Sequence, residues 1–234
     1  MLDSHIAKRS DLEELINTLN PSQKELELAI YDLMINSLNA YKASLNDKVN
    51  QTIELIKEEN NIFNDEKIRE KLFYWFGKYG KSPAFIFVLN YDSALHEHNV
   101  FGGKTERACI GKKINDLNII FDLERIAYED GAILLTNNGL IHSTNVQLQN
   151  VNPAEIYTSK RVKNEHKDKL FGFRQPVNTR HYSSLGASFH MFGTIIYTLG
   201  EESKQIRRFQ QGIITFSTLK EENSLAKRRV KKLL

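Results

Sequence analysis

Residues 84–89, Ala84-Phe-Ile-Phe-Val-Leu89, form a short, continuously apolar run between a proline and an asparagine. A run of this length between turn-forming residues is typical of a buried strand. All glycines of the chain lie at Gly77 or later, and residues 1–76 contain a single proline, Pro21. The sequence therefore predicts helices up to residue 76 and a mixed α/β structure beyond it.

The first 76 residues contain three segments whose apolar side chains recur near helical spacing. Asn20-Pro21 predicts the start of the first helix, because asparagine caps helices well and proline fits the first helical position. These helices either pack on one another and on the following domain, or form a regulatory or oligomerising arm; the sequence leaves both interpretations open. The apolar positions are Leu26, Ile30, Leu33, Leu38 and Tyr41, then Val49, Ile53 and Ile56, and from about Asp65 Ile68, Leu72, Trp75 and Phe76.

Residues 77–220 predict a mixed α/β domain, and residues 221–234 a basic C-terminal tail. Asn138-Gly139 between two apolar runs is a strong signal for a two-residue hairpin turn. Residues 150–178 are polar, contain two prolines and predict a long loop or insertion. The other expected elements are strands at 132–136, 140–142, 194–199 and 213–216, and helices at 117–128, capped by Asp116, and at 183–192.

The charge of the chain is concentrated at one end. The formal net charge is +3, but residues 227–234 hold five basic residues and no acidic ones, which leaves 27 basic against 29 acidic residues elsewhere. The body is not a polycation, so we do not expect it to bind nucleic acid. The tail is either a solvated end or a weak docking patch for phosphate or anionic lipid.

The distribution of apolar residues argues against a membrane span. No stretch approaches ~18 consecutive apolar residues, and the N-terminal segment lacks an apolar signal core. Cys109 is the single cysteine and can form neither an internal disulfide nor a thiolate cluster. We therefore expect a cytoplasmic protein.

Two short segments carry side chains suited to phosphate chemistry. Asp130-Gly131-Ala132 lies where an expected helix meets an expected strand, so its carboxylate projects from the end of an element and its glycine permits close approach of a ligand. Asn178-Thr-Arg-His-Tyr-Ser-Ser184 precedes an expected helix, whose free N–H groups attract anions. Arg180 is suited to bidentate binding of phosphate, and His181 to contact with phosphate or a divalent metal. Either segment alone also fits an ordinary turn or a capped helix start.

Together, Asp130-Gly131-Ala132 and Thr179-Arg180-His181 resemble the paired motifs of the diadenylate cyclase domain. Gly200-Glu201-Glu202-Ser203 falls where that family carries a Ser-Glu-Glu-Thr stretch, and Gln211-Gly212-Ile213 resembles its closing turn and strand. The likeness runs from about Ser82 to Ser217. Residues 1–76 lie outside it and are similar in length and helicity to the arm of the soluble, helix-preceded members.

The resemblance implies a fold, a reaction and a set of site residues. The fold is a mixed sheet with flanking helices, and the reaction condenses two ATP molecules into cyclic di-AMP and two pyrophosphates at two facing active sites of a homodimer or higher oligomer. Asp130 would be catalytic, with Mg²⁺ or Mn²⁺ as cofactor. The implied nucleotide-binding residues are Gly131, Ala132, Thr179, Arg180, His181, Ser183 and Ser184, and the implied metal ligands are Asp130, His181, Glu201 and Glu202.

One position departs from the family pattern and leaves an alternative open. Tyr182 stands where the second motif usually has another arginine, so a phosphate contact is lost or is supplied elsewhere. The alternative function is a catalytically impaired module of the same fold that binds ATP or a dinucleotide. A third hypothesis, nucleic-acid association, would use the tail at 227–234. Candidate substitutes for the missing phosphate contact are Lys169, Arg174, Arg207 and Arg208.

Two further patterns are weak signals for a site. His96 and His98 have a metal-like spacing, but no third ligand lies within sequence reach. Gly102-Gly103-Lys104-Thr105 is similar to the end of a phosphate-binding loop, but it lacks the upstream glycine and the strand–loop–helix setting that such a loop needs.

Overall fold

The computed structural model describes residues 8–59, 65–104, 108–159, 171–175 and 177–223. Seven strands form one mixed sheet in the order β2-β4-β3-β1-β5-β6-β7. Strand β1 runs parallel to β3, and the other neighbouring pairs are antiparallel. The expected mixed α/β class is therefore confirmed. The strands are β1 Phe85–Leu89, β2 Val100–Lys104, β3 Ala132–Leu135, β4 Ile141–Leu148, β5 Ile195–Leu199, β6 Ile206–Gln210 and β7 Ile213–Ser217.

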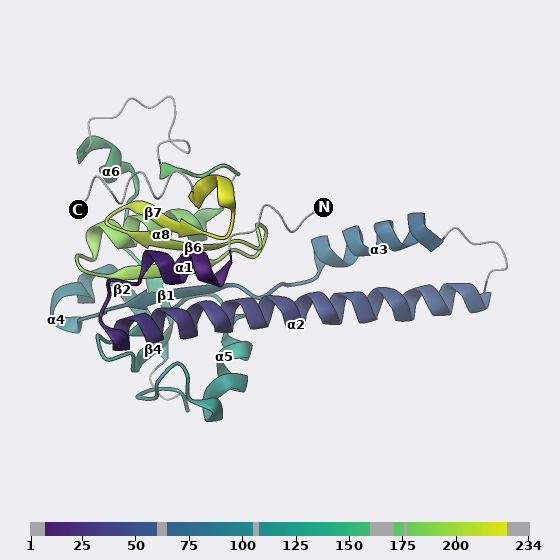
Figure 1. Ribbon diagram of the computed structural model, residues 1–234, viewed down its shortest axis with the longest axis horizontal. Helices are drawn as coiled ribbons and strands as arrows, with labels where there is room; N and C mark the ends of the chain where they lie inside the picture. The colour runs from purple at the N-terminus through teal and green to yellow at the C-terminus, as the bar shows by residue number, and fades with distance from the viewer. Residues whose placement is uncertain (1–7, 60–64, 105–107, 160–170, 176, 224–234) are drawn as a thin grey trace.

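Helices cover both faces of this sheet and extend beyond it (Figure 1). The helices of the first 79 residues are α1 Arg9–Leu15, α2 Pro21–Glu59 and α3 Asp65–Tyr79. Those that follow are α4 Ser93–His96, α5 Ile120–Ile126, α6 Ala154–Ser159 and α8 Thr179–His190, with single 3₁₀ turns at Glu97–Asn99 and Leu117–Ile119. Within these described ranges, no helix combines the length and the apolar character that a membrane crossing needs.

Helix α2 begins where the sequence predicts and continues further than expected. The side-chain oxygen of Asn20 accepts a hydrogen bond from the backbone N–H of Gln23 at 2.9 Å, which caps the helix directly before Pro21. The two periodic segments at 26–41 and 49–56 belong to one continuous helix of 39 residues. Figure 1 shows its second half projecting past the sheet, with α3 folding back alongside.

The first half of α2 is part of the main core. Strand β1 alternates its side chains between the two faces of the sheet, as a buried strand must. Phe85, Phe87 and Leu89 pack in one core with α1 and the start of α2, whereas Ile86 and Val88 pack in another beneath α8. Helix α1 and the first half of α2 therefore cover the first of these two faces of the sheet together with the α5 region.

A buried ion pair fixes α2 to the sheet. The Nε of Arg208 on β6 lies 2.7 Å from Oε2 of Glu27, and the hydroxyl of Tyr197 on β5 donates to the same oxygen at 2.6 Å. The side chain of Glu27 is fully buried. Because a buried charge is costly unless it is paired, each member of this group depends on the others.

Several elements differ from the sequence prediction. Strand β6 was not predicted, nor was the edge strand β2, which contains two glycines. The hairpin between β3 and β4 forms, but its turn spans Thr136 to Gly139, with the Gly139 N–H donating to the Thr136 carbonyl at 2.9 Å. Helix α8 starts at Thr179, four residues before the predicted start. The described part of the predicted 150–178 loop contains α6.

Gly186 in α8 is expected to tolerate no side chain. A Cβ there would lie 1.9 Å from the carbonyl oxygen of Val151, whereas a Cβ at Gly77 in α3 would meet nothing within 4 Å. Gly77→Ala should leave the urea midpoint unchanged or raise it, because alanine is favoured over glycine in helices by about 1 kcal/mol. Gly186→Ala should instead lower stability by about 1–3 kcal/mol through overpacking. Equal effects of the two substitutions would contradict the close contact.

Candidate functional site

A cleft forms at the sheet edge where β3 starts and β5 ends. Strand β1 lies between these two strands, parallel to β3 and antiparallel to β5. Asp130, two residues before β3, and Glu201, two residues after β5, therefore reach the same end of the sheet. The first turn of α8 lies between them and closes the cleft, whose volume is about 500 Å³. The lining residues are Ile86, Asp130, Gly131, Val146, Gln147, Leu148, Asn178, Thr179, Arg180, Ser183 and Glu201.

Arg180 lies between two carboxylates in this cleft. Its Nη2 is 3.3 Å from Oδ1 of Asp130, and its Nη1 is 3.9 Å from Oε2 of Glu201. The arginine side chain is 16% exposed, whereas that of Asp130 is fully exposed at the rim. Exposed pairs of this kind add little stability. Their effect is to orient the guanidinium towards the opening of the cleft.

The start of α8 offers backbone donors to the same cleft. Asn178 is its N-cap residue, but the side chain makes no capping hydrogen bond, and its buried Oδ1 has no hydrogen-bond partner. The N–H groups of His181 and Tyr182 bond to the Asn178 carbonyl. The N–H groups of Thr179 and Arg180 have no acceptor within the helix, and the N-terminal end of a helix attracts anions.

Ser183 and Ser184 differ from their expected role as sources of backbone N–H groups. Because α8 starts at Thr179, both lie inside the helix, where their N–H groups serve the i→i−4 ladder. Ser183 nevertheless lines the cleft. Ser184 is fully buried, and its hydroxyl accepts a hydrogen bond from the Thr198 hydroxyl at 2.7 Å.

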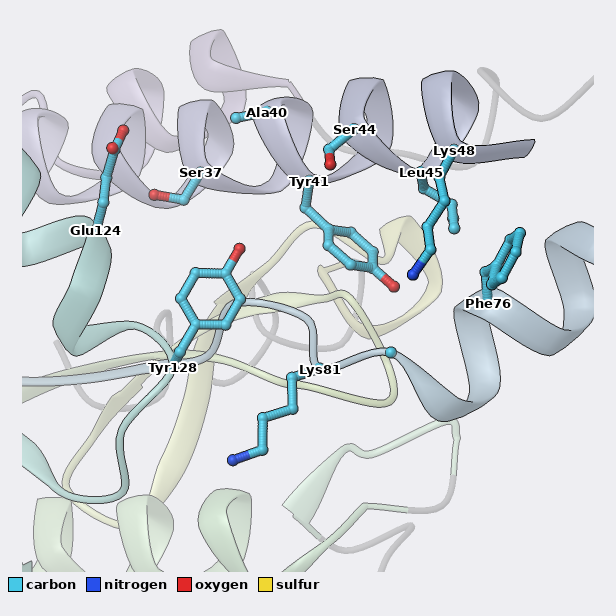
Figure 2. Close-up of a pocket in the computed structure, with 11 residues that line it drawn as sticks. Ser37, Ala40, Tyr41, Ser44, Leu45, Lys48, Phe76, Lys81, Glu124 and Tyr128 are labelled. Carbon is cyan, nitrogen blue, oxygen red and sulfur yellow. The ribbon is translucent and has the colours of Figure 1, made fainter. Parts of the chain in front are cut away.

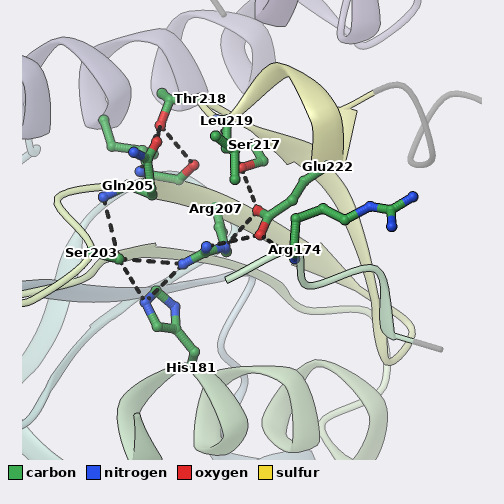
Figure 3. Close-up of polar contacts among 10 residues, drawn as sticks. Arg174, His181, Ser203, Gln205, Arg207, Ser217, Thr218, Leu219 and Glu222 are labelled. Carbon is green, nitrogen blue, oxygen red and sulfur yellow. Dashed lines mark hydrogen bonds and ion pairs between the residues drawn. The ribbon is translucent and has the colours of Figure 1, made fainter. Parts of the chain in front are cut away.

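His181 points from α8 towards Arg207 and Ser203 (Figure 3) and does not line the cleft. It is 1% exposed, and its Nε2 lies 3.0 Å from Nη1 of Arg207 and 3.4 Å from the hydroxyl of Ser203. Side chains of consecutive helical residues point about 100° apart around the helix axis. Because the Arg180 side chain faces the cleft, that of His181 faces the interior. His181 is therefore outside the cleft lining, where its expected contact with phosphate or metal would be made. Its ring lies buried beneath the start of α8.

Burial, together with the positive charges of Arg207 and Arg180, lowers the pKa of His181 to about 3. The unfolded chain binds a proton there near pH 6.5, but the folded protein does so only near pH 3, so stability falls as the pH drops through this window. We expect the free energy of unfolding, obtained from urea denaturation, to fall less steeply below about pH 6.5 in His181→Gln, by up to ~1.4 kcal/mol per pH unit. Equal slopes in the two proteins would contradict a neutral buried imidazole.

The candidate substitutes for a lost phosphate contact lie elsewhere. Arg207 is fully buried and binds Glu222, with Nε–Oε2 at 2.7 Å, and Ser217 donates to the same oxygen (Figure 3). Arg208 binds Glu27. Arg174 donates its backbone N–H to Glu222, and its side chain does not line the cleft. Lys169 lies outside the described residues.

Tyr182 packs on the apolar side of α8. Its ring meets that of Phe173 edge-on, with 5.8 Å between the centroids, and it does not line the cleft. An arginine side chain at position 182 would leave α8 on this same side, away from the cleft. Tyr182→Arg is therefore not expected to add a phosphate contact in the cleft.

Gly131 and Ala132 serve mainly to join β3 to β4. Gly131 has a φ of +124°, and a Cβ there would lie 2.5 Å from the backbone carbon of Asn145. The close approach that this glycine permits is thus to β4, although Gly131 also borders the cleft. Ala132 is fully buried at the start of β3.

The carboxylates suited to a metal are Asp130 and Glu201. Glu202 is exposed and, like His181, is not part of the cleft lining. No group of three or more His, Cys, Asp or Glu side chains placed to hold a metal occurs among the described residues. Mg²⁺ is commonly held by one or two carboxylates together with substrate phosphates. The cleft therefore fits a cation that arrives with a nucleotide, but not a cation held by protein alone.

The other histidine pattern has a structural role. His96 is buried at the end of α4; its Nδ1 accepts the Asp92 N–H at 3.1 Å, and its Nε2 lies 3.0 Å from the Phe192 carbonyl. His98 is exposed in the following 3₁₀ turn. Gly102, Gly103 and Lys104 belong to the edge strand β2, and Thr105 lies outside the described residues.

Sequence reasoning did not predict the floor of the cleft. Val146, Gln147 and Leu148 lie in the second half of β4, beyond the strand expected at 140–142. Polar residues interrupt this half of the strand, with Asn145 at a φ of +56°. The alternation of Val146 and Leu148 around a glutamine was the available signal.

Comparison with known proteins adds no assignment. No family model and no curated protein matches the chain. Among solved structures, the chain is similar to a hypothetical membrane-spanning protein from Bacillus cereus, at 15% identity over 85% of this chain and 99% of that one. The TM-score of 0.38 is too low to support any argument from that likeness.

Proposed function

We propose that the protein is a diadenylate cyclase that condenses two ATP molecules into cyclic di-AMP and two pyrophosphates. The observation that carries the proposal is the meeting of Asp130 and Arg180, fifty residues apart in the chain, within 3.3 Å at the mouth of one cleft. A carboxylate, a guanidinium and a helix N-terminus are the groups that nucleotidyl transfer needs for positioning and charge neutralisation.

The triphosphate would bind at the α8 end of the cleft. Arg180 presents a fork of N–H donors to phosphate oxygens, and the N–H groups of Thr179 and Arg180 add partial positive charge. A divalent cation, Mg²⁺ or Mn²⁺, would neutralise phosphate charge there, with Asp130 and Glu201 as its protein ligands. The apolar side chains of Ile86, Val146 and Leu148 form the part of the lining suited to the nucleoside.

Each half of the reaction is one substitution at phosphorus. The 3′-oxygen of one ATP forms a bond to the α-phosphorus of the other, and the bond from that phosphorus to the β-phosphate oxygen breaks, releasing pyrophosphate. The proton of the 3′-hydroxyl passes to the Asp130 carboxylate and then to solvent. Repeating this step with the two nucleotides exchanged closes the ring.

The exposure of Asp130 supports an arrangement of two facing subunits. A fully solvated carboxylate is a weak base, and the second ATP must approach from outside the cleft. A second copy of the chain facing the rim would bring its own ATP to Asp130 and exclude water. The proposed enzyme is therefore a homodimer or a higher oligomer, inactive as a monomer and located in the cytoplasm, where ATP is supplied.

The direct test is incubation of the purified full chain with ATP and either Mn²⁺ or Mg²⁺. We expect cyclic di-AMP and pyrophosphate in a ratio of about one to two from the stoichiometry, with a rate that rises faster than linearly with protein concentration while dimers assemble. Calorimetric binding of ATP without any product, in a sample shown to be oligomeric, would reject the cyclase and support the nucleotide-binding module.

A further inference from the structure

A second cavity lies between the helical N-terminal region and the sheet domain (Figure 2). Its volume is about 490 Å³, large compared with the roughly 30 Å³ occupied by one water molecule. Helices α2 and α3 form one side, and residues 80–81 with the α5 region form the other. The lining residues are Ser37, Ala40, Tyr41, Ser44, Leu45, Lys48, Phe76, Gly80, Lys81, Glu124 and Tyr128, and none of them lines the Asp130–Arg180 cleft.

Two hydroxyl groups of this cavity lack hydrogen-bond partners. Ser37 is 6% exposed, and its Oγ is buried without a partner, as is the phenolic oxygen of Tyr41. Burial raises the pKa of Tyr41, so its hydroxyl keeps its proton and remains a donor at neutral pH. Buried polar groups are nearly always satisfied in folded proteins. These two hydroxyls are therefore hydrogen-bonding groups that a ligand in the cavity could satisfy.

Positive and negative side chains lie at opposite ends of this cavity. Among the described residues, neither Lys48 nor Lys81 makes an ion pair, and the Lys48 ammonium lies 4.7 Å from the centroid of the Phe76 ring. Figure 2 shows this ammonium and the Tyr41 hydroxyl together at one end of the cavity. Glu124 and the Ser37 hydroxyl lie at the other end, with the Tyr128 hydroxyl turned towards them.

We propose that this cavity binds a small aromatic anion. The anionic group, a phosphate or a carboxylate, would lie at the end formed by Lys48 and Tyr41. A flat ring would pack against the aromatic side chains of Tyr41 and Tyr128, because the Lys48 ammonium lies over the ring of Phe76. A hydrogen-bond donor at the far end of the ligand would meet Glu124 and Ser37.

The position of the cavity connects it to the cleft through a short segment of chain. Tyr128 lines the cavity, and Asp130 lines the cleft two residues later. An occupant that contacts Tyr128 holds the turn that carries Asp130. The binding site itself, however, does not depend on the reaction proposed for the cleft.

The test uses the full chain and two probes, AMP for the phosphate and 4-hydroxybenzoate for the carboxylate. Calorimetry is expected to give a Kd below about 1 mM for at least one probe. Adenosine and inorganic phosphate, each lacking one half of the required chemistry, should bind at least about tenfold more weakly. Trp75, the single tryptophan, is adjacent to Phe76 and supplies an independent fluorescence signal.

Matched variants locate the bound probe. Tyr41→Phe and Lys48→Met should raise its Kd at least about tenfold, and Tyr41→Phe should not lower the thermal midpoint, because it removes an unsatisfied hydroxyl. Lys42→Met, an exposed neighbour on α2, should leave the Kd of both probes unchanged, and Arg180→Ala in the cleft should leave the Kd of 4-hydroxybenzoate unchanged. Absence of binding by both probes would overturn the proposal. Binding that is lost in Arg180→Ala but kept in Lys48→Met would also overturn it, because the probe would then occupy the cleft.

Discussion

Asp130→Asn is expected to lower the rate of cyclic di-AMP formation by about 100-fold or more, the usual contribution of a positioned proton acceptor. Asparagine keeps the size and place of the side chain but neither accepts the 3′-hydroxyl proton nor carries the charge that a metal requires. ATP binding should be largely intact, because Arg180 and the start of α8 remain. Product formation measured by chromatography, beside calorimetric ATP binding, separates these two effects.

Arg180→Ala is the matched comparison for this prediction. It removes the guanidinium that faces both Asp130 and Glu201, so ATP binding and turnover should both decline. Arg180→Lys should restore part of the binding but not the bidentate contact. Asp130 is fully exposed, so its variant should unfold at the same urea concentration as the parent protein. Retention of more than about a tenth of the parent activity by Asp130→Asn would remove that carboxylate from the proposed mechanism.

Glu27→Ala is expected to lower the free energy of unfolding by about 3–5 kcal/mol, because it leaves the buried guanidinium of Arg208 without its counter-charge. The hydroxyl of Tyr197 loses its acceptor in the same step. Glu25→Ala on the exposed side of the same helix should have a small effect. Urea denaturation followed by circular dichroism measures both variants under identical conditions.

A double substitution tests the cause of that loss. Glu27→Leu combined with Arg208→Met replaces the buried pair by apolar side chains of similar volume, and such replacements are often neutral. We therefore expect the double variant to be more stable than Glu27→Ala alone. A loss of under about 1 kcal/mol in Glu27→Ala would show that the pair contributes little to holding α2 on the sheet.

Local patterns were sufficient for the elements whose burial and caps lie within the segment itself. The apolar run at 84–89 predicted β1, and Asn20-Pro21 predicted the start of α2. Strand β6 escaped prediction because Ile206-Arg-Arg-Phe-Gln210 places two adjacent arginines in a buried strand. Those arginines are tolerated only because Glu222 and Glu27 pair with them, and Glu27 lies 181 positions away along the chain.

The candidate site was predicted in part for the same reason. The motif pair suggested that Asp130 and Arg180 share a cleft, and the two side chains do lie together there. The inward position of His181 depended on where α8 begins. Asn178, a good N-cap residue directly before Thr179, was the available signal for that earlier start. The strand order that brings Glu201 to the same edge involves pairings between distant segments, which local patterns do not contain.

The length of α2 has a mechanical consequence. At about 1.5 Å per residue, its 39 residues make a rod of roughly 58 Å, of which the part beyond Tyr41 spans about 27 Å. A rotation of about 10° at the clamped end would displace the free end by roughly 5 Å. A partner that binds the outer end of α2 would therefore exert torque on the sheet. A small movement of the sheet would in turn produce a larger displacement at the outer end of the helix.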